Sequence, residues 1–157
     1  MNWIEWKRNY LILNYINMKT KKRSRSKLVK DLDTIFSRYI RLRDSNRFGI
    51  VICPLCGNSM PRKEAQNMHF IKRSVYLYRR DEENCWAWDY RCNVILKWNY
   101  IEYTRFMQNK FGIEQVDRMI ALSKTIHKIS TSDIEERIQY YKLCVTELEK
   151  RLGIVSK

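Results

Sequence analysis

Residues that break helices are scarce in this chain of 157 residues, which contains four Gly and two Pro. This scarcity argues against a turn-rich all-β fold and favours long helices. Long apolar runs are missing as well. The longest stretch without a charged residue, Phe48 to Pro61, has 14 residues and contains Gly49, Pro54 and Gly57. A helix that spans a bilayer needs about 20 consecutive apolar residues, so we expect no membrane-spanning segment, and the preferred partners do not include a membrane.

A secretory signal is also missing, because Glu5, Lys7 and Arg8 interrupt the first residues and no small-residue cleavage site follows. The cysteine count, five, is odd. In a chain without an export signal, a Cys-x-x-Cys pair such as Cys53 and Cys56 indicates metal binding before it indicates a disulfide. We therefore expect a protein of a reducing cytoplasm.

Acidic residues are also scarce. The chain has 17 Asp and Glu against 31 Lys and Arg, which gives a formal net charge of +14. This excess predicts a partner of dense negative charge, with nucleic acid the first candidate and an anionic membrane surface the second. Residues 19–30 hold seven bases and no acid. We expect this run to form a mobile basic arm, and a plain solvated linker is the alternative.

Apolar residues make up 45% of the chain, enough for the core of one domain. Apolar residues at three- and four-residue spacing predict helices over residues 28–44, 92–110, 113–124 and 134–152. The last of these has Ser132 and Glu135 as a predicted capping box and Gly153 at its end. Extended segments are predicted at 50–52 and through 68–70. The fold class is therefore α+β and mostly helical.

The cysteines predict a structural zinc site. Cys53 and Cys56 can face one ion because two intervening residues let the backbone fold back, and zinc takes four ligands. The second pair is expected across a loop, where Cys92 begins a predicted helix and Asp89 precedes it by three residues. The preferred ligands are Cys53, Cys56, Asp89 and Cys92. Cys85 in place of Asp89 is one alternative, and cysteines that merely fill the core are another.

The chain has two histidines, and they differ in setting. His127 lies in a polar connection and is expected to be solvated, whereas His69 lies in a predicted strand. A strand His, a loop Asn and a residue on the next helix form the arrangement of a ββα-metal nuclease. In that arrangement His69 takes a proton from water and Asn84 orients the loop that carries it. Asn93 contacts a catalytic Mg²⁺ or Mn²⁺ ion, which stabilises the leaving oxygen.

Basic residues lie near these candidate catalytic residues in the sequence. If His69 faces a phosphate, they are placed to hold the flanking DNA backbone. Interleaved aromatic residues suit the stacking of unpaired nucleotides, although filling the core is their alternative role. The candidate nucleic-acid-binding residues are Lys21, Lys22, Arg23, Arg25, Arg41, Lys72, Arg73, Arg79 and Arg80, with Arg38, Arg43 and Arg47 on or just beyond the first helix.

A family resemblance rests on motifs spread along the chain. These are Phe36 to Asp44, Cys53-Pro-Leu-Cys56-Gly57, His69-Phe70 with Arg73, Asp81 to Asn84, Arg91-Cys92-Asn93, and Asn99 with Tyr103. From about Leu28 to Leu152 the chain resembles the NinG (Rap) family of bacteriophage recombination proteins, which belong to the HNH endonuclease class. The resemblance implies a zinc-stapled HNH fold and a nuclease that acts on branched recombination intermediates. Departures from the family pattern are Met68 for Gly, Trp86 for His, Asp89 for Cys and Trp98 for Gly.

We thus expect a zinc-stapled ββα core flanked by helices. Residues 1–27 are predicted to be an extension with the basic arm. Residues 28–157 form the NinG-like HNH domain, with its knuckle and core at about 48–110 and a helical tail at 113–152. The expected function is cleavage of branched or partly single-stranded DNA, for which a homodimer suits symmetrical cuts. A catalytically silent, zinc-containing DNA-binding protein of the same fold is the alternative, and a protein-interaction module is the third.

Overall fold

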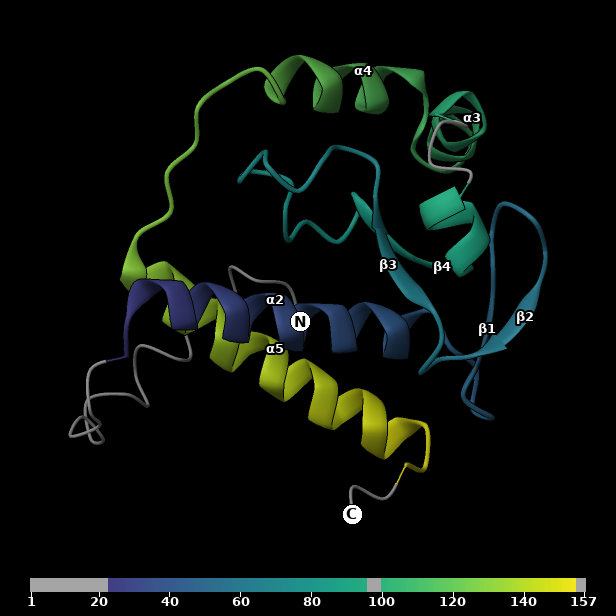
Figure 1. The fold of residues 1–157 in the computed structure, drawn as a ribbon, viewed down its shortest axis with the longest axis horizontal. Coiled ribbons are helices and arrows are strands. Elements are labelled where there is room, and N and C mark those ends of the chain that lie inside the picture. Colours follow the sequence, from purple (N-terminus) through teal and green to yellow (C-terminus); the bar gives the residue numbers. More distant parts are fainter. Residues whose placement is uncertain (1–22, 96–99, 155–157) are drawn as a thin grey trace.

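The computed structural model describes residues 23–95 and 100–154 of the chain (Figure 1). Its elements follow one another in the order α2 (Arg25–Arg43), β1 (Ile50–Ile52), β2 (Ser59–Pro61), β3 (Gln66–His69), β4 (Cys85–Trp88), the π-helical turn η2 (Arg91–Ile95), α3 (Tyr100–Phe111), α4 (Ile113–Leu122) and α5 (Thr131–Arg151). This mixture of helices with small antiparallel sheets agrees with the predicted α+β class. None of the helices in the described ranges is long and apolar enough to cross a membrane.

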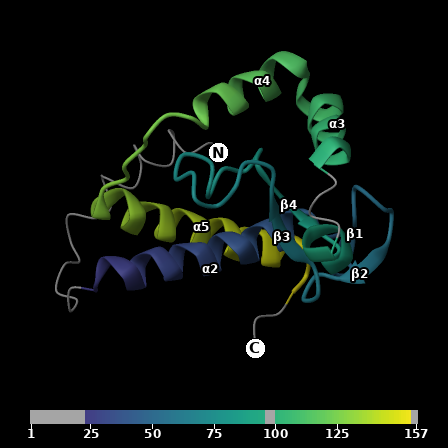
Figure 2. The same cartoon turned by 45° about the horizontal axis from the view of Figure 1, so that its top comes forward.

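Helices α2 and α5 lie side by side and form one layer of the molecule (Figures 1 and 2). They begin at the same end, where the Arg25 guanidinium donates to the Ile129 carbonyl at 2.7 Å. Near their other ends Arg38 pairs with Glu149. Between them the apolar faces meet, and Phe36 packs edge-on against Tyr141 with ring centroids 5.0 Å apart. The predicted tail helix is therefore half of the main helical layer.

The ends of these two helices follow from short polar residues. Helix α2 begins three residues earlier than predicted, because the Ser24 side chain accepts the Lys27 N–H. The predicted capping box of α5 is wrong by two residues, since Ser130 and Asp133 form it in place of Ser132 and Glu135.

Two similar capping patterns overlap at this point, and the apolar neighbours decide between them. Only the earlier box puts Ile129 just before the cap and Ile134 in the first turn, the two positions of a hydrophobic staple. Ile134 is fully buried and Ile129 packs against the core. Gly153 ends the helix as predicted, with a φ of 67° that a residue with a Cβ rarely adopts.

Two two-stranded antiparallel sheets lie at one end of the α2–α5 layer. Strands β1 and β2 pair Val51 with Met60, and the Cys-x-x-Cys turn joins them. Strands β3 and β4 pair His69 with Cys85 and lie against α2. The helical turn η2 and helix α3 follow β4, so the chain contains a strand–strand–helix unit. The predicted helix over 92–110 is present as η2 and α3, and residues 96–99 lie outside the described ranges.

Arg43 and Asp44, at the end of α2, join this helix to β4. The Arg43 guanidinium donates to the carbonyls of Glu82 and Cys85 at 2.7 and 2.8 Å, and also to the Asp44 carboxylate. Asp44 in turn accepts the Ala87 N–H at 2.8 Å. The side chain of Arg43 is 21% exposed. This arginine, expected on the DNA-facing side of its helix, is therefore part of the internal framework.

Replacing Arg43 should destabilise the fold strongly. We expect Arg43→Ala to lower the free energy of unfolding by about 2–3 kcal/mol, because two part-buried carbonyls and a carboxylate lose their donor. Urea unfolding followed by circular dichroism measures this. Arg105→Ala is the control, since its exposed pair with Glu102 should contribute about 0.5 kcal/mol or less. Equal, small losses for both variants would contradict the structural role of Arg43.

Candidate metal centre and the cavity at His69

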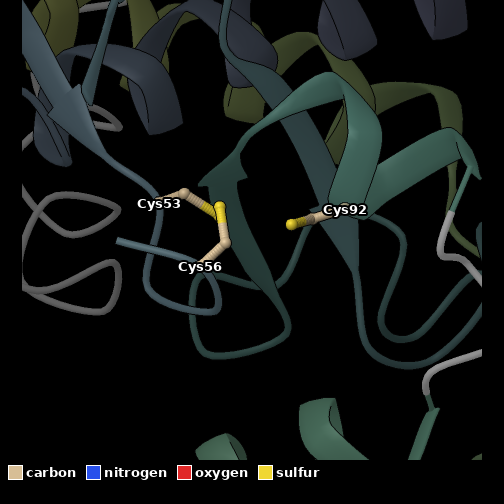
Figure 3. Close-up of side chains that lie close together, drawn as sticks. All are labelled: Cys53, Cys56 and Cys92. Carbon is tan, nitrogen blue, oxygen red and sulfur yellow. The ribbon is translucent and has the colours of Figure 1, made fainter. Parts of the chain in front are cut away.

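Three cysteines from two separate segments converge at the end of the β1–β2 sheet (Figure 3). Cys53 and Cys56 lie in the turn between the strands, which is closed by hydrogen bonds from the Cys53 N–H to the Asn58 carbonyl and from the Gly57 N–H to the Cys53 carbonyl. Cys92 reaches them from η2. All three sulfur atoms lie within 4.8 Å of one another. Cys53 and Cys92 are buried, whereas Cys56 is exposed.

The three sulfurs suit zinc in both chemistry and spacing. Zinc binds thiolates at about 2.3 Å in a tetrahedral arrangement, which places two sulfur ligands about 3.8 Å apart. Within residues 23–95 and 100–154, no other set of three His, Cys, Asp or Glu side chains is gathered this closely. Three cysteines leave the fourth position of a tetrahedral ion to a ligand from outside the set.

Asp89, the fourth predicted ligand, does not join the sulfurs. Its carboxylate accepts the Asn58 side-chain amide at 2.6 Å and the Arg91 N–H at 2.7 Å. Its backbone carbonyl accepts the Asn93 N–H at 3.0 Å. Asp89 therefore caps η2 and ties it to the cysteine turn. The alternative ligand, Cys85, is fully buried opposite His69 and outside the cysteine group.

The thiols differ in how readily they ionise. Burial, together with the neighbouring Cys56 and Cys53 sulfurs, raises the pKa of Cys92 to about 12. Desolvation also opposes ionisation of Cys56, but the Asn58 N–H and the other two thiols outweigh it and lower the pKa of Cys56. Metal ligation requires thiolates, so ion binding must release protons at this centre.

His69 ends β3, and its ring is fixed by the backbone of the following segment. The ring Nε2 lies 3.0 Å from the Arg79 carbonyl. A carbonyl only accepts, so Nε2 carries the proton and Nδ1 is left to act as a base. Burial lowers the pKa of His69, against the Arg79 and Asn67 carbonyls, which favour the protonated ring. The imidazole is therefore neutral at pH 7.

Asn84 is the last residue of the segment between β3 and β4, the segment that also carries the Arg79 carbonyl. Its side chain is 0% exposed. It accepts the Ile71 N–H at 2.6 Å and donates to the carbonyls of Ile71 and Tyr78 at 3.0 and 2.8 Å. The structure thus places Asn84 where it holds both ends of the loop that follows His69.

Asn93 and Trp86 are the neighbouring positions of interest. Asn93 is half-buried in η2, directly after Cys92, and its N–H closes the turn from Asp89. Trp86 packs edge-on against Phe106 and donates from Nε1 to the Glu83 carbonyl. Cations of Arg43 and Lys110 each lie 4.4 Å from its ring centroid. The indole is therefore part of the packing around β4.

A cavity of about 150 Å³ opens beside the His69 ring. Arg41, Arg73 and Arg79 contribute to its wall, together with Asn67 and Asp33. The Asn67 side-chain oxygen is buried and has no hydrogen-bond partner among the described residues. The wall is basic, so the cavity is suited to an anionic group.

The remaining predicted DNA-binding residues are not equally available. Lys72 is exposed and Arg73 is 60% exposed. Arg80 is only 3% exposed and its guanidinium pairs with Asp33 at 2.7 Å, so this candidate is buried in the framework. Arg23 pairs with Asp31. Arg25, already described, is tied to α5, and Lys21 and Lys22 lie outside the described residues.

Asp33 is the residue at this site that the sequence patterns did not single out. It stands one residue after Leu32 and three before Phe36, at the edge of the apolar face of α2. An acid at that edge, in a helix without acidic residues in its first turn, is the signal that would have marked it.

The fold and the cysteine centre define a small mixed helical and β-sheet protein with a candidate structural metal site. The family model of the bacteriophage lambda NinG protein matches residues 13–151. The chain therefore belongs to the NinG family of phage recombination-related proteins, as its motifs indicated. No curated protein and no solved structure matches the chain.

Loss of one clustered cysteine should abolish metal binding. We expect the wild-type chain to carry about one zinc ion and Cys92→Ser to carry almost none, because two ligands hold zinc poorly. Native mass spectrometry measures the stoichiometry, and thermal unfolding should show a lower midpoint for the variant. Cys144→Ser, on α5 and outside the cluster, is the control. Retention of a full zinc equivalent by Cys92→Ser would count against this centre.

Asp89 gives a separate prediction, because replacing its carboxylate by an amide should preserve a helix cap but should weaken a zinc ligand. Asn is as good a helix cap as Asp but a poor zinc ligand. We expect Asp89→Asn to keep about one zinc ion per chain in the same mass-spectrometric measurement. A loss comparable to that of Cys92→Ser would instead make the carboxylate a ligand of the bound ion.

Proposed function

We propose that this NinG-family chain is a metal-dependent endonuclease of the HNH type that hydrolyses phosphodiester bonds in branched or partly single-stranded DNA. It would act in the cytoplasm of the phage-infected cell, and cuts in two arms of a junction would suit a homodimer. The observation that carries the proposal is the His69 ring. His69 is the last residue of β3 in the strand–strand–helix unit. Its Nδ1 atom is left as a base, and its ring borders a cavity lined by arginines.

In this proposal His69 removes a proton from the attacking water through Nδ1. The Arg79 carbonyl keeps Nε2 protonated and so fixes the tautomer. Asn84 holds the loop that presents that carbonyl. Arg41, Arg73 and Arg79 face the charge of the phosphate.

A divalent ion belongs to the proposal as Mg²⁺ or Mn²⁺. Such an ion is commonly held by one or two protein ligands together with the substrate phosphate, and Asn93 is the protein ligand we propose. When bound, the ion would neutralise charge on the leaving oxygen. Besides the cysteines, the described residues gather no second cluster of three His, Cys, Asp or Glu side chains, so the substrate phosphate would have to supply much of the coordination of this ion.

A catalytically silent DNA-binding protein of the same fold is the second candidate. Trp86 favours it, since the resemblance puts a histidine at this position and the indole here is engaged in packing. In this reading the cysteine centre and the basic surface remain, and the charge of +14 supports binding to DNA.

The proposal is tested by incubating labelled branched DNA with the purified full-length chain and Mg²⁺ or Mn²⁺. We expect cutting by the wild type and a loss of about 10²- to 10⁴-fold for His69→Ala, the usual contribution of a general base. His127→Ala is the matched control, because His127 is the other histidine and lies exposed in the segment before α5. Its rate should equal that of the wild type.

The pH profile adds a second criterion. A neutral His69 is the active form, and its pKa lies below the usual value of about 6.5. The cleavage rate should therefore be constant through neutral pH and fall only as the pH drops through the lowered pKa of His69. Tight, salt-dependent binding of DNA without cutting would replace the nuclease by the second candidate. Weak binding that barely depends on salt would overturn both.

A further inference from the structure

One carboxylate, Asp33 on α2, gathers three arginines from the segment between β3 and β4. It pairs with Arg79 and with Arg80, each at 2.7 Å, and more loosely with Arg73 at 3.5 Å. Asp33 and His69 line the same cavity. We propose that Asp33 is a positioning residue for His69, which it controls through the backbone of Arg79. This inference rests on the proposed role of His69 as a base.

The contact between Asp33 and Arg79 is a two-pronged one. Arg79 Nε donates to one carboxylate oxygen at 3.1 Å, and Nη2 donates to the other at 2.7 Å. Such a fork fixes the direction of the guanidinium as well as its distance. The carbonyl of the same residue accepts from His69 Nε2. Two steps therefore lead from the Asp33 carboxylate to the ring.

The neighbouring residue strengthens this arrangement. Arg80, whose side chain is buried, pairs with the same carboxylate and donates to the Val29 carbonyl of α2 at 3.3 Å. The Arg79 carbonyl belongs to the peptide that joins Arg79 to Arg80. Asp33 consequently anchors the residues on both sides of the peptide group that orients His69.

Asn84 does not replace this anchor. Its side chain bonds to the backbone of Ile71 and Tyr78, and it reaches the Arg79 carbonyl only through the Cys85 thiol, by two long contacts of 4.0 Å each. The Arg79 N–H bonds to the Val75 carbonyl within the loop itself. Asn84 thus shapes the loop, and Asp33 ties Arg79 and Arg80 of that loop to α2.

The charge of Asp33 also acts on the ring. The charged groups that face His69 are Asp33 and Arg41 from α2, and Arg73 and Arg79 from the loop. Desolvation opposes ionisation of Asp33, but its hydrogen bond with Arg79 and the nearby arginine charges outweigh this and lower the pKa of the carboxyl. Asp33 is therefore ionised, and its charge favours the protonated imidazole, whereas that of Arg73 opposes it.

Replacement of Asp33 by Asn should therefore have a set of effects that simple destabilisation does not produce. The Nε2–H tautomer of His69 should give way to a mixture, and the pKa of His69 should fall further. The cavity wall should become more basic, so DNA should bind more tightly while turnover falls. We expect kcat to fall about 10-fold, in keeping with a misplaced general base, and KM to stay the same or fall.

The experiment is ¹⁵N–¹H NMR of the imidazole rings in the full-length zinc-loaded chain, as a function of pH. With two histidines in the sequence, His127→Ala assigns the signals. Asp31→Asn is the matched control, because Asp31 lies on the same helix and pairs with Arg23, away from the loop. It should leave the tautomer and the pKa of His69 unchanged. Arg79→Ala is the second variant, since it removes the fork and keeps Asp33 and the Arg79 carbonyl.

Each outcome decides the matter. A tautomer change in the folded Asp33→Asn chain, or in Arg79→Ala if Asp33→Asn does not fold, but not in Asp31→Asn, supports the inference. An unchanged tautomer in that same variant overturns it even if the pKa of His69 falls, because loss of the Asp33 charge lowers this pKa without moving the ring. Because NMR does not depend on cleavage, a wild type that cuts no DNA refutes the proposed function and leaves this measurement valid. Normal cutting by Asp33→Asn with an unchanged pH profile refutes only the inference.

Discussion

The attachment of α2 to the segment before and within β4 is the constraint on which the site depends. At the end of the helix Arg43 and Asp44 hold the backbone of β4 and the residues before it. Earlier in the same helix, Asp33 forms ion pairs with Arg79 and Arg80 in the loop after β3. Both attachments are made by charged groups that bond to backbone or to one another in partly buried positions, where such bonds are strong. Helix α2 therefore acts as the rigid support for the β3–β4 pair and its histidine.

This arrangement changes the meaning of the high positive charge. A run of arginines on a helix and a loop predicts a nucleic-acid surface when it is read as sequence. In the fold, Arg43 and Arg80 are used internally, and Arg79 is shared between a carboxylate and the cavity wall. Lys72 and Arg73 remain exposed. Fewer of the predicted DNA-binding arginines are therefore available to a ligand than the composition suggests.

The sequence allowed the helices, the strand that leads into the cysteine turn and the convergence of Cys53, Cys56 and Cys92 to be predicted. Helical spacing and the Cys-x-x-Cys turn are local patterns, so they can be recognised without knowledge of the fold. The capping box was misplaced because two similar patterns overlap and a tertiary contact of Ile134 decides between them. The roles of Asp33 and Asp89 escaped prediction, because each depends on partners that are distant in sequence, Arg79 in one case and Asn58 in the other.

The pairing of the first described helix with the last has a consequence for synthesis. Arg25 and Ile129, which are joined by a hydrogen bond, are 104 residues apart. Contacts of such long sequence separation are slow to form, because the chain must close a large loop before it gains them. During translation the part of α2 that packs against α5 has no partner until α5 leaves the ribosome. The nascent chain therefore exposes this part of α2 until α5 has been made, and the α2–α5 layer is the last part of the described fold to form.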